Sequence, residues 1–230
     1  LDILFSKPKE LLERKIPITL YKSQKLDGEN VQIGFNKRLN AWVIGSRTAS
    51  VIAREESQLK VFRAKRNSKL DVSILAAEIW FNIIKTKFTG EKLEELKKDL
   101  DGKNLVGELV GHPLYENIIR YQDTKIIFYA ITELHSNASC IPISTFLSFA
   151  EKYCLETAKI EKAEEYYTFK SLLNGLKDLY RKISESGIEE EGEGSVMYFQ
   201  ADSGKKVGII SHCKIMTLEY KIYSILKEKV

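Results

Sequence analysis

The sequence predicts an α+β fold in which antiparallel sheets are flanked by helices. Segments of alternating apolar and polar residues occur early, in the middle and late in the chain, and segments with helical spacing lie between them. Because strands and helices are clustered instead of alternating one by one, a parallel βαβ arrangement is disfavoured. The 230 residues, 43 % hydrophobic and 30 % charged, are enough to form a folded core and are not typical of a disordered chain.

The first half of the chain carries both patterns. Alternation around the turn formers Asp27-Gly28 predicts three short antiparallel strands within residues 18–46. Apolar residues at helical spacing predict a helix over 67–88, and a Lys- and Glu-rich segment predicts a second helix over 91–100. We expect both helices to lie on the outside of a sheet.

The second half returns to strands after a helical region. Strands are expected over 104–110 and 125–132, a helix from Pro142 to about 153, a long charged helix over 161–186, strands over 194–200 and 206–211, and a final helix over 218–229. We therefore expect one domain, residues 1–230, with a helical insertion over 134–187 between its central and final strands. Because the chain begins at Leu1 and not at Met, we also expect that it has been excised from a longer protein with additional covalently linked domains.

Charge and cysteine usage limit the environment and the partners. The net charge of +4 permits a nucleic-acid partner without requiring one. The three cysteines are widely spaced and form no CxxC pair, so neither a disulfide framework nor a zinc knuckle is indicated. The longest apolar run, over 126–131, is far shorter than the roughly 20 residues of a membrane span. We expect an intracellular protein, cytoplasmic or nuclear, without a membrane partner.

The most distinctive local feature is Lys25-Leu26-Asp27-Gly28, at the end of a predicted strand. A lysine fixed at such a point can act as a nucleophile when desolvation or neighbouring positive charge lowers its pKa from about 10.4. Asp27 adds a carboxylate, and Gly28 permits a tight turn that brings the backbone near a phosphate. On its own the segment fits an ordinary hairpin turn better than a nucleophile.

Two further carboxylates are candidates for ligand binding. Glu108 interrupts an apolar strand, where a carboxylate needs a partner such as a hydroxyl group or a cation, although it could also face water at the strand end. Glu193 ends the acidic run 189–193 directly before a predicted strand, which makes it a candidate ligand for a hard divalent cation. The alternative for this run is a solvated acidic loop.

Four other side chains have types that suit a nucleotide. Lys214 could neutralise a phosphate or face solvent on an edge strand, and Arg47 has the planar fork that phosphate oxygens prefer. Phe128 could stack on a base, although an aromatic residue in such an apolar run more often belongs to the core. Gln24 offers an amide to the edge of a base.

Six segments in order resemble the motifs of the covalent nucleotidyltransferases, the superfamily of ATP-dependent DNA and RNA ligases and mRNA capping enzymes. They are Lys25-Leu26-Asp27-Gly28, Gly45-Ser46-Arg47, the runs 105–111 and 126–131, Glu193-Gly194-Ser195-Val196, and Cys213-Lys214-Ile215. Together they extend over most of the chain. The resemblance implies a nucleotidyltransferase core, similar to the ATP-grasp-like fold of ligases, built from antiparallel sheets flanked by helices.

The resemblance also assigns roles. It implies ATP and Mg²⁺ or Mn²⁺ as cofactors, and a covalent lysyl-AMP on Lys25. The implied catalytic residues are Lys25, Asp27, Glu193 and Lys214; the implied nucleotide-binding residues are Gln24, Lys25, Gly28, Arg47, Glu108, Phe128, His212 and Lys214; and the implied metal ligands are Asp27 and Glu193.

Two positions depart from the family pattern. His212 stands where relatives often carry a lysine, so one phosphate contact is absent or is made by the imidazole. Val106 stands where many relatives have an aromatic residue, so stacking on the base is weaker there or comes from another residue.

The C-terminal length bears on the branch of the superfamily. Only sixteen residues follow Lys214, which is too few for the OB-fold of capping enzymes and DNA ligases. This favours the RNA-ligase branch, with phage-type or tRNA-ligase-like enzymes that seal RNA 5′-phosphate ends to 3′-hydroxyl ends. The alternatives are a non-catalytic nucleotide- or RNA-binding module, a GTP-dependent capping guanylyltransferase and a DNA ligase core. The sequence contains no GxxxxGK, GxGxxG, HExxH or GxSxG motif that would indicate another chemistry.

Overall fold

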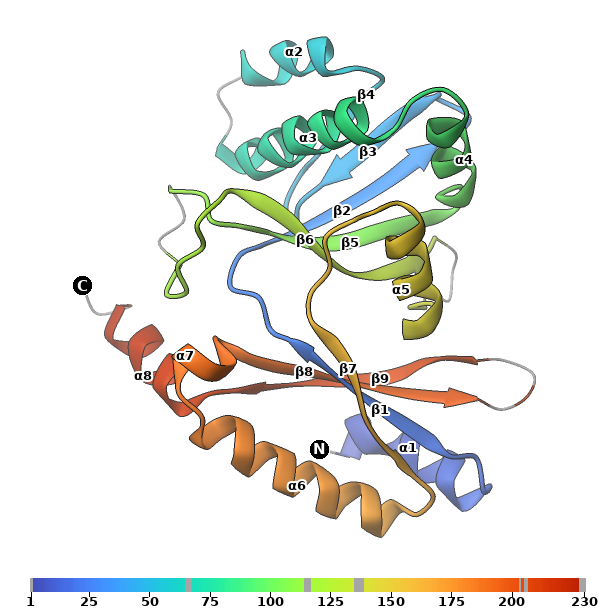
Figure 1. Cartoon of the computed structure of the whole chain (residues 1–230), viewed down its shortest axis with the longest axis vertical. Helices are drawn as coiled ribbons and strands as arrows, with labels where there is room; N and C mark the ends of the chain where they lie inside the picture. Colours follow the sequence, from blue (N-terminus) through green and yellow to red (C-terminus); the bar gives the residue numbers. More distant parts are fainter. Residues whose placement is uncertain are drawn as a thin grey trace.

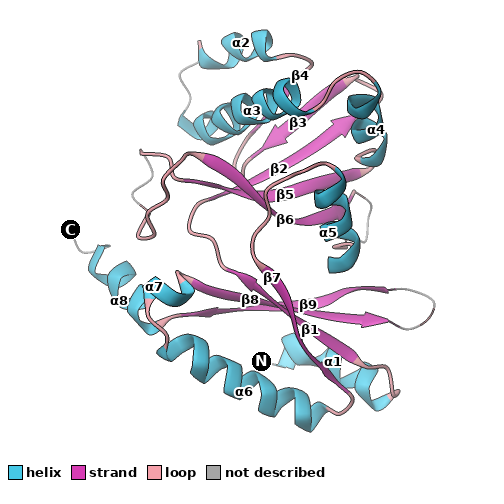
Figure 2. Cartoon of the chain, in the orientation of Figure 1, coloured by secondary structure: helices cyan, strands magenta, loops and turns pink. Residues whose placement is uncertain are grey.

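The computed structural model describes residues 2–64, 68–113, 117–134, 139–202, 204 and 207–227. Its strands form two antiparallel sheets, which lie one above the other in Figures 1 and 2. Sheet A has the order β7 (Ile160–Tyr166), β1 (Ile18–Gln24), β8 (Gly194–Asp202), β9 (Val207–Met216). Sheet B has the order β4 (Ser50–Ala53), β3 (Ala41–Gly45), β2 (Glu29–Asn36), β5 (Lys103–Val110), β6 (Lys125–Glu133). The expected α+β class with antiparallel sheets is confirmed.

Helices lie over the outer face and at the ends of each sheet (Figure 1). Those beside sheet B are α2 (Leu59–Arg63), preceded by the short 3₁₀ turn η1 (Glu56–Gln58), α3 (Ser68–Lys87), α4 (Glu91–Asp99) and α5 (Ile143–Lys152). Those beside sheet A are α1 (Asp2–Glu13), α6 (Phe169–Glu185), α7 (Ile188–Glu191) and α8 (Leu218–Lys227). Among the described residues, no helix combines the length and the apolar character that crossing a membrane requires.

Each sheet has its own hydrophobic core under these helices. Beneath α3, the fully buried Trp80 packs edge to face against Trp42 of β3 and Phe128 of β6, with ring centroids 5.2 and 6.1 Å apart. Beneath α6, buried Leu172 and Leu176 belong to the same cluster as strand residues of sheet A. With the outer faces filled, the inner faces of the two sheets are left to form a site.

The predicted helices 67–88, 91–100 and the helix after Pro142 are present as α3, α4 and α5. The three strands expected within residues 18–46 are present as β1, β2 and β3, but they do not form one sheet. β1 pairs with β7 and β8 in sheet A, whereas β2 and β3 belong to sheet B. The segment between β1 and β2 therefore passes from one sheet to the other, and it contains Lys25.

The expected helix over 161–186 is wrong in its first part. Residues Ile160–Tyr166 form β7, which pairs antiparallel with β1, and only from Phe169 does the chain become the helix α6. Glu, Lys and Ala favour a helix locally, but β7 is an edge strand whose charged side chains are mostly exposed, and the main-chain bonds to β1 decide its form. The hydroxyl of Thr168 caps α6 by accepting a bond from the amide of Ser171.

It follows that the region 134–187 is not wholly helical, because β7 completes sheet A. That this region is an insertion and that residues 1–230 form one domain stay predictions. The elements α1, β4 and α2 carried no clear signal in the sequence and were not predicted.

Candidate active site

The inner faces of the two sheets enclose a cavity of about 230 Å³. Sheet A and the residues after β1 supply one side of it, and β5 and β6 supply the other. Its lining includes Gln24, Lys25, Val106, Glu108, Tyr129, Thr132, Cys140, Tyr198, His212 and Lys214. Five of the predicted site residues are thus brought together here: Gln24, Lys25, Glu108, His212 and Lys214.

Strand register explains how sheet A faces the cavity. Lys214 of β9 lies opposite Val196 of β8, and His212 lies opposite Tyr198. Because side chains alternate along a strand, these four residues share one face, whereas Phe199 points into the core under α6. The two departures from the family pattern, His212 and Val106, both line the cavity.

Lys25 lies at the point where the chain leaves β1 for sheet B. Its amide donates a bond of 2.8 Å to the carbonyl of Gly194, and its ammonium forms an ion pair with the carboxylate of Glu193. Glu193 is only 5 % exposed. Burial raises the pKa of Glu193, and the neighbouring Lys25 charge opposes that shift. The lysine therefore has a buried carboxylate in direct contact.

Glu108 projects from β5 into the same cavity and is partly buried. Burial raises its pKa to about 7; the charges of Lys25 and Lys214 oppose the shift, and those of Glu193 and Glu29 add to it. A carboxyl group of this kind binds a hydroxyl group or a cation more readily than one that faces water.

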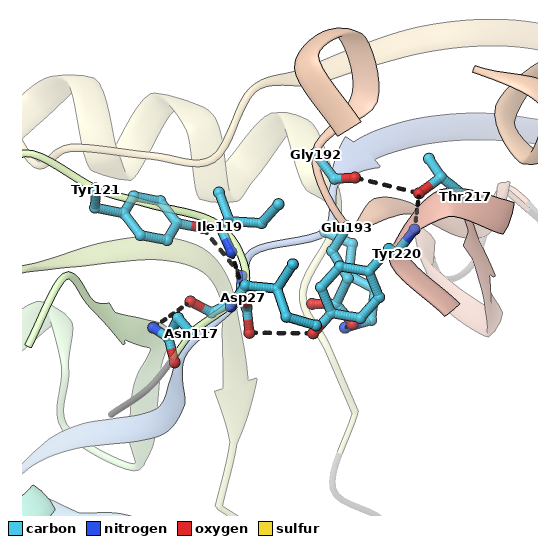
Figure 3. A network of polar contacts seen from close by, with 10 residues as sticks. Asp27, Asn117, Ile119, Tyr121, Gly192, Glu193, Thr217 and Tyr220 are labelled. Carbon is cyan, nitrogen blue, oxygen red and sulfur yellow. Dashed lines mark hydrogen bonds and ion pairs between the residues drawn. The ribbon is translucent and has the colours of Figure 1, made fainter. Parts of the chain in front are cut away.

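Asp27 and Gly28 hold the segment that carries Lys25. The Asp27 carboxylate accepts bonds from the amides of Ile118 and Ile119 at 2.8 and 2.9 Å and from the hydroxyl of Tyr220 at 3.2 Å (Figure 3). A Cβ on Gly28 would lie 2.3 Å from the carbonyl oxygen of Leu109, so this close approach to β5 requires glycine. The roles of Asp27 as a metal ligand and of Gly28 at a phosphate stay predictions.

The expectation that Phe128 stacks on a base is wrong. Phe128 is 1 % exposed and packs against Trp80 in the core of sheet B. Its neighbour Tyr129 lines the cavity instead, at an irregularity where the β5–β6 register shifts. The hydroxyl of Tyr129 accepts a 2.8 Å bond from the side-chain amide of Asn30.

Arg47 lies in the exposed turn after β3 and is not among the described residues that line the cavity. Its proposed contact with phosphate stays a prediction.

Besides Tyr129, the cavity residues that sequence reasoning missed include Tyr198, Thr132 and Cys140. Tyr198 could have been found, because it follows Val196 by two positions on β8 and so shares its face. Thr132 could have been assigned to the cavity only if the register between β5 and β6 had been known. Cys140 had no sequence signal, because only the bridge between its backbone and that of Thr132 places it at the cavity.

A larger apolar groove, of about 740 Å³, lies between α1 and α6 away from these residues. Its charged lining residues among those described are Lys9 and Lys177, and it has no carboxylate. The smaller cavity between the sheets is therefore the candidate active site, because it alone of the two combines lysines, a carboxylate and aromatic rings.

The fit of a metal ion can be judged from the oxygen donors. Within the described ranges, no three or more His, Cys, Asp and Glu side chains are grouped so that they could hold a metal ion. Glu193 and Glu108 are close enough for the charge of one to raise the pKa of the other. Mg²⁺ in nucleotide enzymes commonly takes one or two carboxylates and completes its shell with phosphates and water. The residues thus fit a cation that arrives with a nucleotide.

The comparison with known families agrees with this geometry. The model of the RNA ligase family matches residues 19–210, which is most of the chain. The chain belongs to the RNA ligase family. The matched range includes Lys25, Glu108 and Glu193, whereas His212 and Lys214 of this RNA ligase family member lie just beyond it.

Solved structures of ligases share the fold. A variant of the Naegleria gruberi RNA ligase, solved with ATP and Mn, has a TM-score of 0.56 and 13 % identity over 94 % of this chain and 54 % of its own. An archaeal ATP-dependent RNA ligase has a TM-score of 0.52 and 13 % identity over 94 % of this chain and 47 % of its own. A putative ATP-dependent DNA ligase from Aquifex aeolicus has a TM-score of 0.52 and 16 % identity over 94 % of this chain and 49 % of its own.

This RNA ligase family member therefore spans about half the length of the solved ligases that it matches. Among curated protein sequences, none matches it. The resemblance to the covalent nucleotidyltransferases and the expected ligase-type core are both confirmed.

Proposed function

We propose that this chain is the adenylyltransferase part of an ATP-dependent RNA ligase, with Lys25 as the residue that becomes AMP-linked. The observation that carries the proposal is the position of the Lys25 ammonium: it lines the cavity between the sheets and is paired with the buried Glu193. A surface lysine in a hairpin turn would have neither feature. Because the chain spans about half of its structural relatives, the activity of the whole protein is part of the proposal.

In the first step, the unprotonated amine of Lys25 attacks the α-phosphorus of ATP. A phosphorus–nitrogen bond forms, the bond between the α-phosphorus and the bridging oxygen breaks, and pyrophosphate leaves with the electron pair. Before the attack the lysine must lose a proton, and the carboxylate of Glu193 is in contact to accept it. The raised pKa of Glu193 makes it a better proton acceptor than an exposed carboxylate.

The remaining residues of the cavity bind and orient the nucleotide. Lys214 supplies a positive charge for the phosphate oxygens on which negative charge increases during transfer. Glu108 accepts hydrogen bonds from the ribose hydroxyls, and Tyr129 and Tyr198 offer ring surfaces to the base. These two tyrosines supply the aromatic surface that Val106 does not.

A divalent cation, when bound, neutralises charge on the triphosphate, and Glu193 and Glu108 are the carboxylates that would hold it.

The later steps are also part of the proposal. The AMP passes to the 5′-phosphate of an RNA, forming a phosphoanhydride bond and freeing Lys25. The 3′-hydroxyl of a second end then attacks that phosphate, a phosphodiester bond forms, and AMP leaves. An RNA substrate follows from the family, and the 5′-phosphate and 3′-hydroxyl ends are part of the proposal.

The test is transfer of label from α-phosphate-labelled ATP to the protein with Mg²⁺ or Mn²⁺. We expect acid-stable label on the wild-type chain, none on Lys25→Ala, and normal label on Lys162→Ala, whose lysine is exposed on β7. Label from GTP in place of ATP would indicate a capping guanylyltransferase. A folded chain that binds ATP but takes no label would overturn the proposal in favour of a binding module.

A further inference from the structure

Lys25 and Glu193 form an ion pair, and the start of α8 is bonded to both of the chain segments that carry them. Figure 3 shows its bonds to Gly192 and to Asp27. On one side, the amide of Thr217 donates to the carbonyl of Glu193 at 3.1 Å, and its hydroxyl donates to the carbonyl of Gly192 at 3.4 Å. On the other side, the hydroxyl of Tyr220 donates to Asp27, two residues after the lysine. One helical turn thus joins the segment that carries the carboxylate to the segment that carries the amine.

This turn is well defined by its own bonds. The hydroxyl of Thr217 accepts a bond of 3.2 Å from the amide of Tyr220, the geometry of a helix N-cap. Thr217 is fully buried. The position of the Tyr220 backbone is therefore set by the same residue that is bonded to Glu193.

Every polar group of Asp27 takes part in a hydrogen bond. Besides the three bonds to its carboxylate, its amide donates to the hydroxyl of Tyr121 at 3.0 Å, and its carbonyl accepts from the side chain of Asn117 at 2.9 Å (Figure 3). The loop over 117–121 supplies four of these five bonds. Tyr220 supplies the fifth, and of the five it is the one that comes from α8.

Core packing does not account for this contact. All ten residues of α8 are described and none is buried, and its apolar residues Leu218, Ile222 and Ile225 are each at least half exposed. Burial and the charges of Glu193 and Asp27 raise the pKa of Tyr220, so the hydroxyl keeps its proton and can donate it to the carboxylate. The phenol is placed for a polar contact and not to fill a core.

Building on the proposed function, we propose that Tyr220 is a positioning residue for the nucleophile. Through Asp27 it holds the Lys25 segment at a fixed place relative to Glu193, which the same helical turn holds through Thr217. Tyr220 lies beyond the part of the chain that the family model matches, so the family match does not assign this role. In this mechanism the hydroxyl aligns the amine for attack and does not contact ATP.

The experiment measures the formation of lysyl-AMP in single-turnover reactions at several ATP concentrations. The variant is Tyr220→Phe, which removes the hydroxyl and keeps the ring. The matched control is Tyr223→Phe, a tyrosine one turn later on α8 that is 48 % exposed. We expect Tyr220→Phe to lower the maximal rate about tenfold, which corresponds to about 1.4 kcal/mol, with the half-saturating ATP concentration changed less than about twofold. Tyr223→Phe should match the wild type.

Thermal melts of the three proteins separate positioning from folding. Unchanged melting temperatures together with the slower Tyr220→Phe reaction would support the role. A maximal rate equal to that of the wild type would overturn it, and so would a loss of rate shared by Tyr223→Phe or explained by a lower melting temperature. If the wild-type chain itself takes no label, the proposed function fails and the positioning role fails with it. An equal maximal rate of labelling in the wild type and Tyr220→Phe would refute the positioning role alone.

Discussion

Replacing Glu108 by glutamine should stabilise the fold at alkaline pH and at the same time impair the reaction with ATP. In the folded chain the pKa of Glu108 is about 7, raised from an ordinary value of 4.5 because the group is buried. The folded state therefore holds the proton more tightly than the unfolded state does. Between pH 4.5 and 7 the unfolded chain releases the proton while the folded chain keeps it, so the free energy of unfolding falls as the pH rises.

The size of this effect follows from the same two values. At about 1.36 kcal/mol for each pH unit between them, the ionised Glu108 costs the folded state about 3 kcal/mol once the pH is well above 7. Glutamine cannot ionise and has nearly the shape of the protonated acid. Glu108→Gln should therefore match the wild type near pH 4 and exceed its free energy of unfolding by up to about 3 kcal/mol near pH 9.

Urea unfolding followed by tryptophan fluorescence measures this difference. Both tryptophans, Trp42 and Trp80, are buried in the core of sheet B and should report the transition. The control is Glu185→Gln at the exposed end of α6, whose stability relative to the wild type should stay within about 0.5 kcal/mol at each pH. If Glu108→Gln and the wild type lose stability in parallel between pH 4 and 9, the reasoning about Glu108 is wrong. Weaker lysyl-AMP formation in a more stable variant would show that Glu108 serves function at the expense of stability.

Two further predictions concern the core of sheet B and the lining of the cavity. Phe128→Ala should lower the free energy of unfolding by about 3–5 kcal/mol, because it leaves a void beneath Trp80 in the core of sheet B. A change below about 1 kcal/mol in urea unfolding would contradict its position in the core. Saturating ATP should slow the alkylation of Cys140, which lines the cavity, without changing the rate at the exposed Cys154. Mass spectrometry after iodoacetamide treatment would measure both rates, and equal rates at Cys140 with and without ATP would argue against nucleotide binding in this cavity.

The residues of the proposed chemistry were predicted from the sequence because the segments that carry them resemble, in the same order, the motifs of the covalent nucleotidyltransferases. Lys25 follows β1, Glu108 interrupts the apolar β5, and Lys214 alternates with apolar residues on β9. Period-two alternation assigns such side chains to one face of a strand without knowledge of the fold. The order of these segments along the chain was enough to indicate the family.

The sequence was less informative where two faces of one strand were both apolar. Phe128 and Tyr129 are adjacent in an apolar run, and alternation says that they point in opposite directions but not which of them meets the cavity. The helices over sheet B decide this, because Trp80 covers the face that contains Phe128. In the same way, the charged composition of β7 favoured a helix until its backbone bonds to β1 were known.

The sequence by itself determined the class of fold, the lysine motif and the carboxylates that could serve it. Only the tertiary structure decided that Glu193 is the partner of Lys25 and that Tyr220, 193 residues from Asp27, bonds to its carboxylate. The physical reason is that sequence patterns are local. Periodicity shows which side chains of one strand or helix share a face, and turn-forming residues show where a strand ends. Which distant donor fills the hydrogen-bonding capacity of a carboxylate depends on how two sheets and a terminal helix pack, and no local pattern records that.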